Sequence, residues 1–222
     1  MTEGNTEMGI LLWGELVFEE RVTRLCICNC LQWYDFDMVY VFDFFGVISS
    51  EVAPFWFAQH LPNYDITELR KNYMVDADLG KTPLNVFYGK LAELTNQTTE
   101  TIAQQWNDLA VIDSKVVQVV ENLGKNHQVA LLSNAPTDLI RPILKRHDLE
   151  RLFELIVISG EVGMVKPNQD IYLHTLSSLG SKPEETLFID DNKKNVDTAK
   201  MLCMKTILYD SYLDIDKLVE RS

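Results

Sequence analysis

The sequence predicts an α/β fold in which a parallel sheet is wrapped by helices, giving a three-layer core. From residue 113 onward, apolar residues at helical spacing alternate with short apolar runs. Alternation of helix and strand is typical of parallel sheets. In addition, three apolar runs of the chain end in polar residues, and open parallel sheets bind ligands outside the carboxyl ends of their strands. We therefore expect a functional site where these runs end.

The first of these runs covers residues 39–42 and is followed directly by Asp43, and Gly46 comes three residues later. Its β-branched and aromatic residues predict a buried strand that ends at the aspartate. Taken alone, Asp43 has two interpretations. It is either a chemical group placed at a strand end or a cap for the turn that follows.

The later elements follow one another at short intervals. We expect strands over residues 128–132, 155–158, 186–190 and 205–209, with helices between them. One helix should cover residues 139–146, where Pro142 fits only if the helix begins near Asp138. Asn168 is expected to cap the helix before the strand that ends at Asp190.

Residues 51–110 predict helices without a strand. Leu84, Phe87, Leu91 and Leu94 recur at helical spacing. We expect these residues to form a small helical cap, with residues 38–50 and 111–222 as the core domain. Aromatic residues at helical spacing more often form a core than contact a substrate, so we assign to the interior of the cap Phe55, Trp56, Phe57, Tyr73, Phe87, Tyr88 and Trp106.

Residues 1–37 form an N-terminal extension of uncertain status, and we expect Met38 to be the natural start of the protein. Within the extension, Cys26, Cys28 and Cys30 form a cluster. A chain of this size does not need a disulfide framework, and the cluster lacks the Cys-x-x-Cys spacing of zinc sites. We therefore assign no metal to it.

Composition excludes several classes of partner. A net charge of −13 argues against nucleic acid or an anionic membrane as the main partner. It does not argue against phosphate substrates, because a metal ion and a lysine can reverse the field inside one cleft. Without a long apolar run or the basic start of a signal peptide, the chain is expected to be cytoplasmic.

Four groups of residues occur in a fixed order along the chain. Asp43 follows the first run, and later come a serine with an asparagine, a Lys-Pro pair and two adjacent aspartates, closed by two asparagines: Ser133, Asn134, Lys166, Pro167, Asp190, Asp191, Asn192 and Asn195. This order resembles the haloacid dehalogenase-like (HAD) hydrolase superfamily over roughly residues 38–210. It is most similar to the small sugar-phosphate phosphatases with a helical cap after the first motif, which implies a Rossmann-like core.

The resemblance implies a Mg²⁺-dependent phosphatase that hydrolyses small phosphorylated metabolites, sugar phosphates first, through an aspartyl-phosphate on Asp43. Ser133, Asn134 and Lys166 would bind the phosphate, with main-chain amides contributing, and Lys166 would balance its charge. The implied ligands of Mg²⁺ are Asp43, the main-chain carbonyl of Phe45, Asp190 and Asp191. Substrate choice is assigned to the cap, where the sequence leaves open which of Gln59, His60, Tyr73 or Lys81 faces the cleft.

Phe45 departs from the phosphatase pattern, because many phosphatases of the superfamily have a second aspartate there that acts as general acid and base. Such help is typically worth ~10²- to 10⁴-fold in rate, so its loss should lower turnover without abolishing phosphate binding.

Phe45 leaves two alternatives to the phosphatase open. An aromatic residue at this position also resembles the 2-haloacid dehalogenases, although these lack the aspartate pair kept at Asp190 and Asp191. The other alternative is a non-catalytic HAD-fold protein that binds a phosphorylated metabolite.

Overall fold

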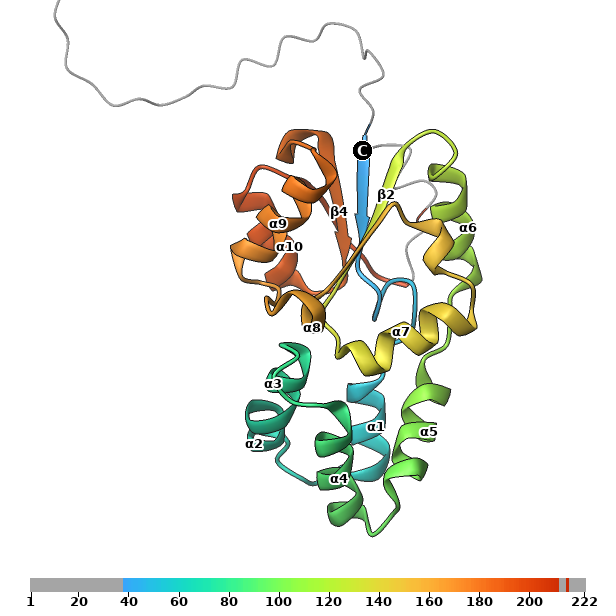
Figure 1. Ribbon diagram of the computed structural model, residues 1–222, viewed down its shortest axis with the longest axis vertical. Helices are drawn as coiled ribbons and strands as arrows, with labels where there is room; N and C mark the ends of the chain where they lie inside the picture. Colours follow the sequence, from blue (N-terminus) through green and yellow to red (C-terminus); the bar gives the residue numbers. More distant parts are fainter. Residues whose placement is uncertain (1–37, 212–214, 216–222) are drawn as a thin grey trace, which may run out of the picture. The chain divides into compact units, whose positions relative to one another are not determined.

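The computed structural model describes residues 38–211 and residue 215 of the chain (Figure 1). Five parallel strands form one sheet in the order β3-β2-β1-β4-β5. Their bounds are Val39–Phe42 for β1, Gln128–Ser133 for β2, Leu155–Ile158 for β3, Thr186–Asp190 for β4 and Lys205–Leu208 for β5. The predicted parallel α/β class is confirmed, and the strand that precedes Asp43 lies at the centre of the sheet.

Alternate residues of β1 enter two different cores. Tyr40 and Phe42 pack in the core that includes α6 and α7, whereas Val39 and Val41 pack in the core that includes α9. Figure 1 shows α6 on one side of the sheet and α9 and α10 on the other. The helices of the sheet region are α6 (Ser114–Leu123), α7 (Thr137–Arg146), α8 (Ser159–Val162), α9 (Gln169–Leu179) and α10 (Lys193–Met201), with short 3₁₀ turns η2 (Glu150–Leu152) and η3 (Pro183–Glu185).

The segment between β1 and α6 is helical, as the sequence predicts. It contains α1 (Ala53–His60), α2 (Thr67–Leu69), the π-helical turn η1 (Arg70–Met74), α3 (Val75–Asp78), α4 (Leu84–Thr95) and α5 (Thr99–Leu109). Figure 1 shows these helices beyond the end of the sheet where β1 terminates. We refer to them as the helical insertion. Its assignment as a separate cap domain, and the boundaries given above, remain predictions.

Aromatic rings form the interior of the helical insertion. The Trp106 ring lies 5.5 Å from Phe87 and 6.5 Å from Phe57, measured between ring centroids. Trp56 and Tyr88 are also buried. The prediction is wrong for Phe55, whose side chain is 57% exposed, because it occupies the outer face of α1.

The helical insertion contacts the sheet region closely at α8. The Ser159 hydroxyl donates a hydrogen bond of 2.6 Å to the main-chain carbonyl of Asp78. Gly80 has φ +68°, and a Cβ atom there would lie 2.1 Å from the carbonyl oxygen of Gly160. Only glycine permits such a close approach of two backbones. This contact places the end of α3 beside α8, at the end of β3.

Two helix predictions concern single residues. Asn168 caps α9, because its side chain accepts a hydrogen bond of 3.1 Å from the amide of Asp170. Helix α7 begins at Thr137, so Pro142 is its sixth residue and lies inside it. A proline there leaves the carbonyl of Asp138 without its helical donor, a cost that the buried Ile140, Ile143 and Leu144 offset by packing.

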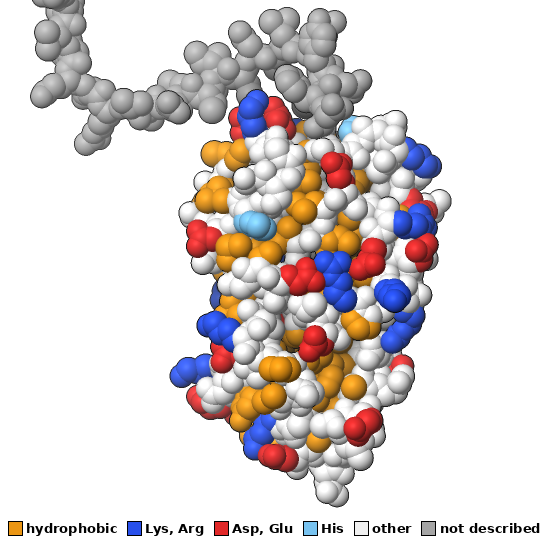
Figure 2. Space-filling model, viewed as in Figure 1, with side chains coloured by type: hydrophobic (Ala, Val, Ile, Leu, Met, Phe, Trp, Pro, Cys, Tyr) orange, Lys and Arg blue, Asp and Glu red, His pale blue; other side chains and the backbone are white. Residues whose placement is uncertain are grey.

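Some predictions fall outside the described residues, namely those on the extension 1–37 and on its cluster of Cys26, Cys28 and Cys30, and the start at Met38 remains a prediction. Within the described part, no helix combines the length and the apolar composition needed to cross a bilayer. On the face shown in Figure 2, Lys and Arg side chains are interspersed with Asp and Glu and form no continuous basic area.

Candidate active site

Lys166 lies at the centre of the predicted site and is 3% exposed. Its ammonium group is 2.8 Å from three acceptors, which are Oδ1 of Asp43, Oδ2 of Asp190 and the main-chain carbonyl of Leu132. An ammonium group has three protons, so each one has an acceptor. The lysine therefore joins the ends of β1, β2 and β4 at one point, and its charge offsets those of two buried carboxylates.

Asp190 is fully buried and held on both oxygens. Besides Lys166, it accepts hydrogen bonds from the side-chain amide of Asn195 at 3.0 and 3.1 Å and from the main-chain amide of Asn192 at 2.7 Å. Because its acceptor sites are occupied, Asp190 is the most constrained carboxylate of the site. It fixes the positions of Lys166 and of the loop that begins α10.

Three carboxylates converge at the ends of β1 and β4. One oxygen each of Asp43, Asp190 and Asp191 lies within 4.8 Å of the others. Oxygens on opposite sides of a bound Mg²⁺ are about 4.2 Å apart, given Mg–O distances of ~2.0–2.1 Å. Since carboxylates are hard ligands that Mg²⁺ accepts, the cluster fits this ion after small adjustments.

Gly46 makes the approach of Asp191 possible. Its φ is +83°, and a Cβ atom at this position would lie 2.2 Å from Oδ2 of Asp191. A side chain here would be strained and would displace the carboxylate. The glycine after Phe45 thus places Asp191 against the loop that follows Asp43.

Two carboxyl groups of the site, Asp43 and Asp191, have raised pKa values. Burial raises the pKa of Asp43 well above its ordinary value, and Lys166 lowers it only in part. Burial and then the charge of Asp190 raise the pKa of Asp191. Burial alone would lower the pKa of Lys166, but Asp43 and Asp190 raise it overall. A divalent cation would favour the ionised form of both carboxyl groups that face it.

The two polar residues after β2 differ in their contacts. The side chain of Asn134 forms two hydrogen bonds of 2.8 Å with the main chain of Lys166, one to its carbonyl and one from its amide. The Asn134 side chain therefore positions Lys166. The contact with phosphate predicted for Asn134 would be made by its main-chain amide. The Ser133 hydroxyl is fully buried and has no hydrogen-bond partner among the described residues. An orphaned hydroxyl of this kind fits a ligand oxygen, although Ser133 itself does not line the cavity that Asn134 lines.

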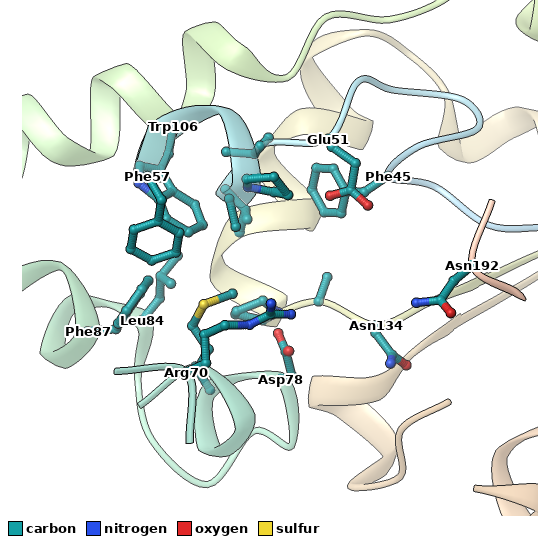
Figure 3. A pocket seen from close by; sticks show the side chains of 18 of the residues that line it. Phe45, Glu51, Phe57, Arg70, Asp78, Leu84, Phe87, Trp106, Asn134 and Asn192 are labelled. Atoms are coloured by element: carbon teal, nitrogen blue, oxygen red, sulfur yellow. The ribbon is translucent and has the colours of Figure 1, made fainter. Parts of the chain in front are cut away.

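A cavity of about 300 Å³ opens beside these groups (Figure 3). Asp43, Asn134, Lys166, Asp191 and Asn192 form its polar end. The helical insertion supplies most of the remaining wall, which is largely apolar: Val52, Ala53, Pro54, Phe57, Ile66, Met74, Ala77, Leu84, Phe87 and Trp106. This volume is at the lower end of small-molecule sites, so the cavity suits a small ligand with a polar and an apolar end.

Three charged residues of the wall could not be predicted from the motifs, namely Glu51, Arg70 and Asp78. They follow no fixed spacing, and helical periodicity does not separate a residue that faces a cavity from one that faces solvent. By contrast, none of Gln59, His60, Tyr73 and Lys81 lines this cavity. Phe45 does line it, half-buried, with its ring 4.9 Å from that of Phe44.

Comparison with known sequences identifies the family of the chain. Residues 40–209 match the profile of the haloacid dehalogenase-like hydrolases, and this stretch contains the whole site described above. The chain belongs to the haloacid dehalogenase-like hydrolase family. The resemblance seen in the motifs is thereby confirmed.

Several known proteins are similar to the chain over part of its length. It is 30% identical over 86 residues to a phosphoglycolate phosphatase of Salmonella paratyphi A and 36% identical over 83 residues to a phosphoserine phosphatase of Thermus thermophilus. These stretches cover 37% of the chain in both cases and 34% and 33% of the respective relatives, about a third of their length.

Structural similarity extends further than sequence similarity. A HAD family enzyme of Bacteroides thetaiotaomicron, solved in complex with magnesium and inorganic phosphate, superposes with a TM-score of 0.70. The match covers 82% of the chain and 98% of that protein at 23% sequence identity. At this level of identity the comparison establishes a shared fold.

Proposed function

We propose that the protein is a Mg²⁺-dependent phosphatase that hydrolyses small phosphate monoesters through an aspartyl-phosphate on Asp43. The observation that carries this proposal is the position of Asp43. Its carboxylate lies at the end of the central strand, 2.8 Å from Lys166, within the cluster formed with Asp190 and Asp191, and it lines the cavity. A nucleophile, a cation and metal ligands are thus next to space for a substrate.

Each residue of the site has a distinct task in this proposal. Bound Mg²⁺ would neutralise the substrate phosphate and the attacking carboxylate. Asp43 and Asp191, which line the cavity, would hold the ion together with the main-chain carbonyl of Phe45. Asp190 is close enough to contact the ion as well, but its hydrogen bonds to Lys166 and to the amide of Asn192 indicate that it mainly positions Lys166.

Asp43 would attack phosphorus in line with the leaving oxygen, so that a P–O bond forms to Asp43 and the ester P–O bond breaks. The charge of Lys166 would balance that of the phosphoryl group, and the Ser133 hydroxyl and the main-chain amides after Asp43 and Ser133 would donate hydrogen bonds to its oxygens. Water then attacks phosphorus, which releases inorganic phosphate and restores the Asp43 carboxylate.

Because Phe45 cannot donate a proton, the leaving oxygen would take its proton from the carboxyl group of Glu51, which would recover one from the attacking water. Glu51 lines the cavity near Phe45 in Figure 3, and burial together with Asp191 raises its pKa.

The alternative function, that of a 2-haloacid dehalogenase, has Phe45 in its favour. However, that chemistry needs no metal, and it gives no reason for three carboxylates within 4.8 Å.

The comparisons support this proposal at the level of chemistry. Relatives named phosphoglycolate and phosphoserine phosphatase share sequence with the chain, and the similar enzyme of Bacteroides thetaiotaomicron was solved with magnesium and phosphate. Sugar phosphates are the substrates that the motif resemblance implies, and the cytoplasm remains the predicted location.

Phosphate release from a panel of small phosphate monoesters tests the activity. We expect release with Mg²⁺ and none with a chelator, because the single charge of Lys166 is already offset by Asp43 and Asp190 and cannot also screen a phosphate dianion. Asp191→Asn should raise the Mg²⁺ concentration for half-maximal release at least ~10-fold, which corresponds to ~1.4 kcal/mol of binding free energy. Asp108→Asn, on the exposed face of α5, is the control. Release that persists in chelator would contradict the proposal.

A further inference from the structure

The wall of the cavity combines three kinds of surface in a fixed order. At one end are the polar groups of the proposed phosphate site, including Asn134 and Asn192 (Figure 3). At the other end are the side chains of Phe57, Leu84 and Phe87. Between them, Arg70 and Asp78 direct their charged ends into the same part of the cavity.

Arg70 is the cation of this middle region. Among the described residues, Lys166 and Arg70 are the two cations that line the cavity, and Lys166 is committed to Asp43 and Asp190. Arg70 is exposed, and its side chain forms no hydrogen bond or ion pair with a described residue, so its five N–H donors are available to a ligand. It also begins the π-helical turn η1, and such turns are frequent at functional sites.

Asp78 is the carboxyl group nearest to this cation in the wall. Burial raises its pKa to about 7, with Arg70 lowering it in part. A carboxyl group that is largely neutral below this pH does not cancel the charge of Arg70. The middle of the cavity is therefore suited to an oxygen acceptor of the ligand, and best to an anionic one.

The apolar end is unsuited to a polyol. Hydroxyl groups buried without partners cost about 1–3 kcal/mol each, and the side chains at this end are aromatic or aliphatic, with Nε1 of Trp106 as one buried donor that has no partner among the described residues. Phe57, Phe87 and Trp106 line this end and pack edge to face on one another, with ring centroids 5.5 to 6.5 Å apart, so a ring of the ligand would meet aromatic side chains there. Sugar phosphates thus match the phosphate end of the cavity but not its opposite end.

We propose that the cavity selects phosphate monoesters of hydroxy acids with an apolar, ring-sized side chain. The phosphate would lie at Asp43 and Lys166, the carboxylate would bind Arg70, and the side chain would pack against Phe57 and Phe87. This inference rests on the proposed phosphatase activity and names its substrate class.

Four probes separate the parts of this substrate. Phenyllactate phosphate has all three features, phenethyl phosphate lacks the carboxylate, phospholactate lacks the ring, and glucose phosphate replaces both with hydroxyls. We expect kcat/KM to be highest for phenyllactate phosphate. Loss of the ring or of the carboxylate should each lower it at least ~10-fold, as expected for a buried aromatic group and a charge-assisted hydrogen bond.

The variant Arg70→Ala tests the contact with the carboxylate. It should lower kcat/KM for phenyllactate phosphate by ~10- to 100-fold and change that for phenethyl phosphate less than ~3-fold. Lys71→Ala is the matched control, because Lys71 is the next residue of the same turn, is exposed and does not line the cavity. Arg70→Lys should restore part of the loss, since it keeps the charge but not the planar fork.

The outcomes separate this inference from the proposed function. The substrate class would be overturned if kcat/KM were higher for glucose phosphate or phospholactate than for phenyllactate phosphate. It would also be overturned if Arg70→Ala and Lys71→Ala had the same kcat/KM for phenyllactate phosphate. Either result would leave the proposed phosphatase activity intact. If no probe is hydrolysed, the proposed activity fails, and the ligand specificity of the cavity is then tested by calorimetric binding of the same probes in the presence of Mg²⁺. Tightest binding of phenyllactate phosphate, weakened by Arg70→Ala, would support the inference, and equal affinities would reject it.

Discussion

At the scale of single residues, most of the site was predictable because its chemistry follows strand ends. Asp43, Ser133 and Asp190 each terminate a buried apolar run, and parallel strands bring such ends to one edge of a sheet. Lys166 lies on a loop rather than at a strand end. Its position could be expected only from the order of the motifs, because nothing in its local sequence predicts a buried lysine with three acceptors.

Gly46 gives a residue-scale prediction about the metal site. Gly46→Ala should destabilise the fold by roughly 1–2 kcal/mol through its positive φ, and it should also weaken Mg²⁺ binding by displacing Asp191. Gly163→Ala is the control, since Gly163 has φ +68° with no atom within 4 Å of the added Cβ. Both variants should lose stability in denaturant unfolding, but only Gly46→Ala should lose calorimetric Mg²⁺ affinity. Equal Mg²⁺ affinity in the two variants would contradict this role.

At the scale of elements, the helical insertion was predictable in kind but not in detail. Spacing predicted its helices, and the aromatic residues of α1, α4 and α5 form its interior. The short elements α2, η1 and α3 were not predicted, because they carry no apolar stripe of useful length. They supply Arg70, Met74, Ala77 and Asp78 to the cavity. The elements proposed to determine substrate specificity are therefore the ones that are least predictable from the local sequence.

The end of α3 gives a prediction about pH. Asp78 has an ordinary pKa of 3.8 and a folded-state pKa of about 7, so the folded protein binds more protons than the unfolded chain between these values. Stability should therefore fall as pH rises from 4 to 7, by at most about 4 kcal/mol from this group. Asp78→Asn should remove this contribution to the decrease of the unfolding free energy with pH.

Chemical denaturation of wild type and Asp78→Asn at several pH values measures this difference. Asp78→Asn should gain stability relative to wild type as pH rises through this window, with no further gain above about pH 8. Asp76→Asn, on the same helix but with a more exposed side chain, controls for loss of a surface charge. A difference between wild type and Asp78→Asn that does not change with pH would show that Asp78 is ionised normally.

At the scale of the whole molecule, the sheet supplies the reacting groups and the helical insertion covers them. The order β3-β2-β1-β4-β5 places β1 in the middle, so Asp43 receives neighbours from β2 and β4 on both sides. The contacts at Gly80 and Ser159 join the end of α3 to α8 and the loop after β2. This arrangement explains why one cavity is lined by residues as distant in sequence as Arg70 and Asn192.

The measurement that tests the central claim most directly is the rate of Mg²⁺-dependent phosphate release by Asp43→Asn. The amide keeps the size of the side chain but cannot act as the nucleophile, so we predict a loss of at least ~10³-fold in kcat relative to wild type and to Asp108→Asn. Circular dichroism confirms that the variant is folded. Turnover by folded Asp43→Asn within tenfold of wild type would show that Asp43 is not the nucleophile.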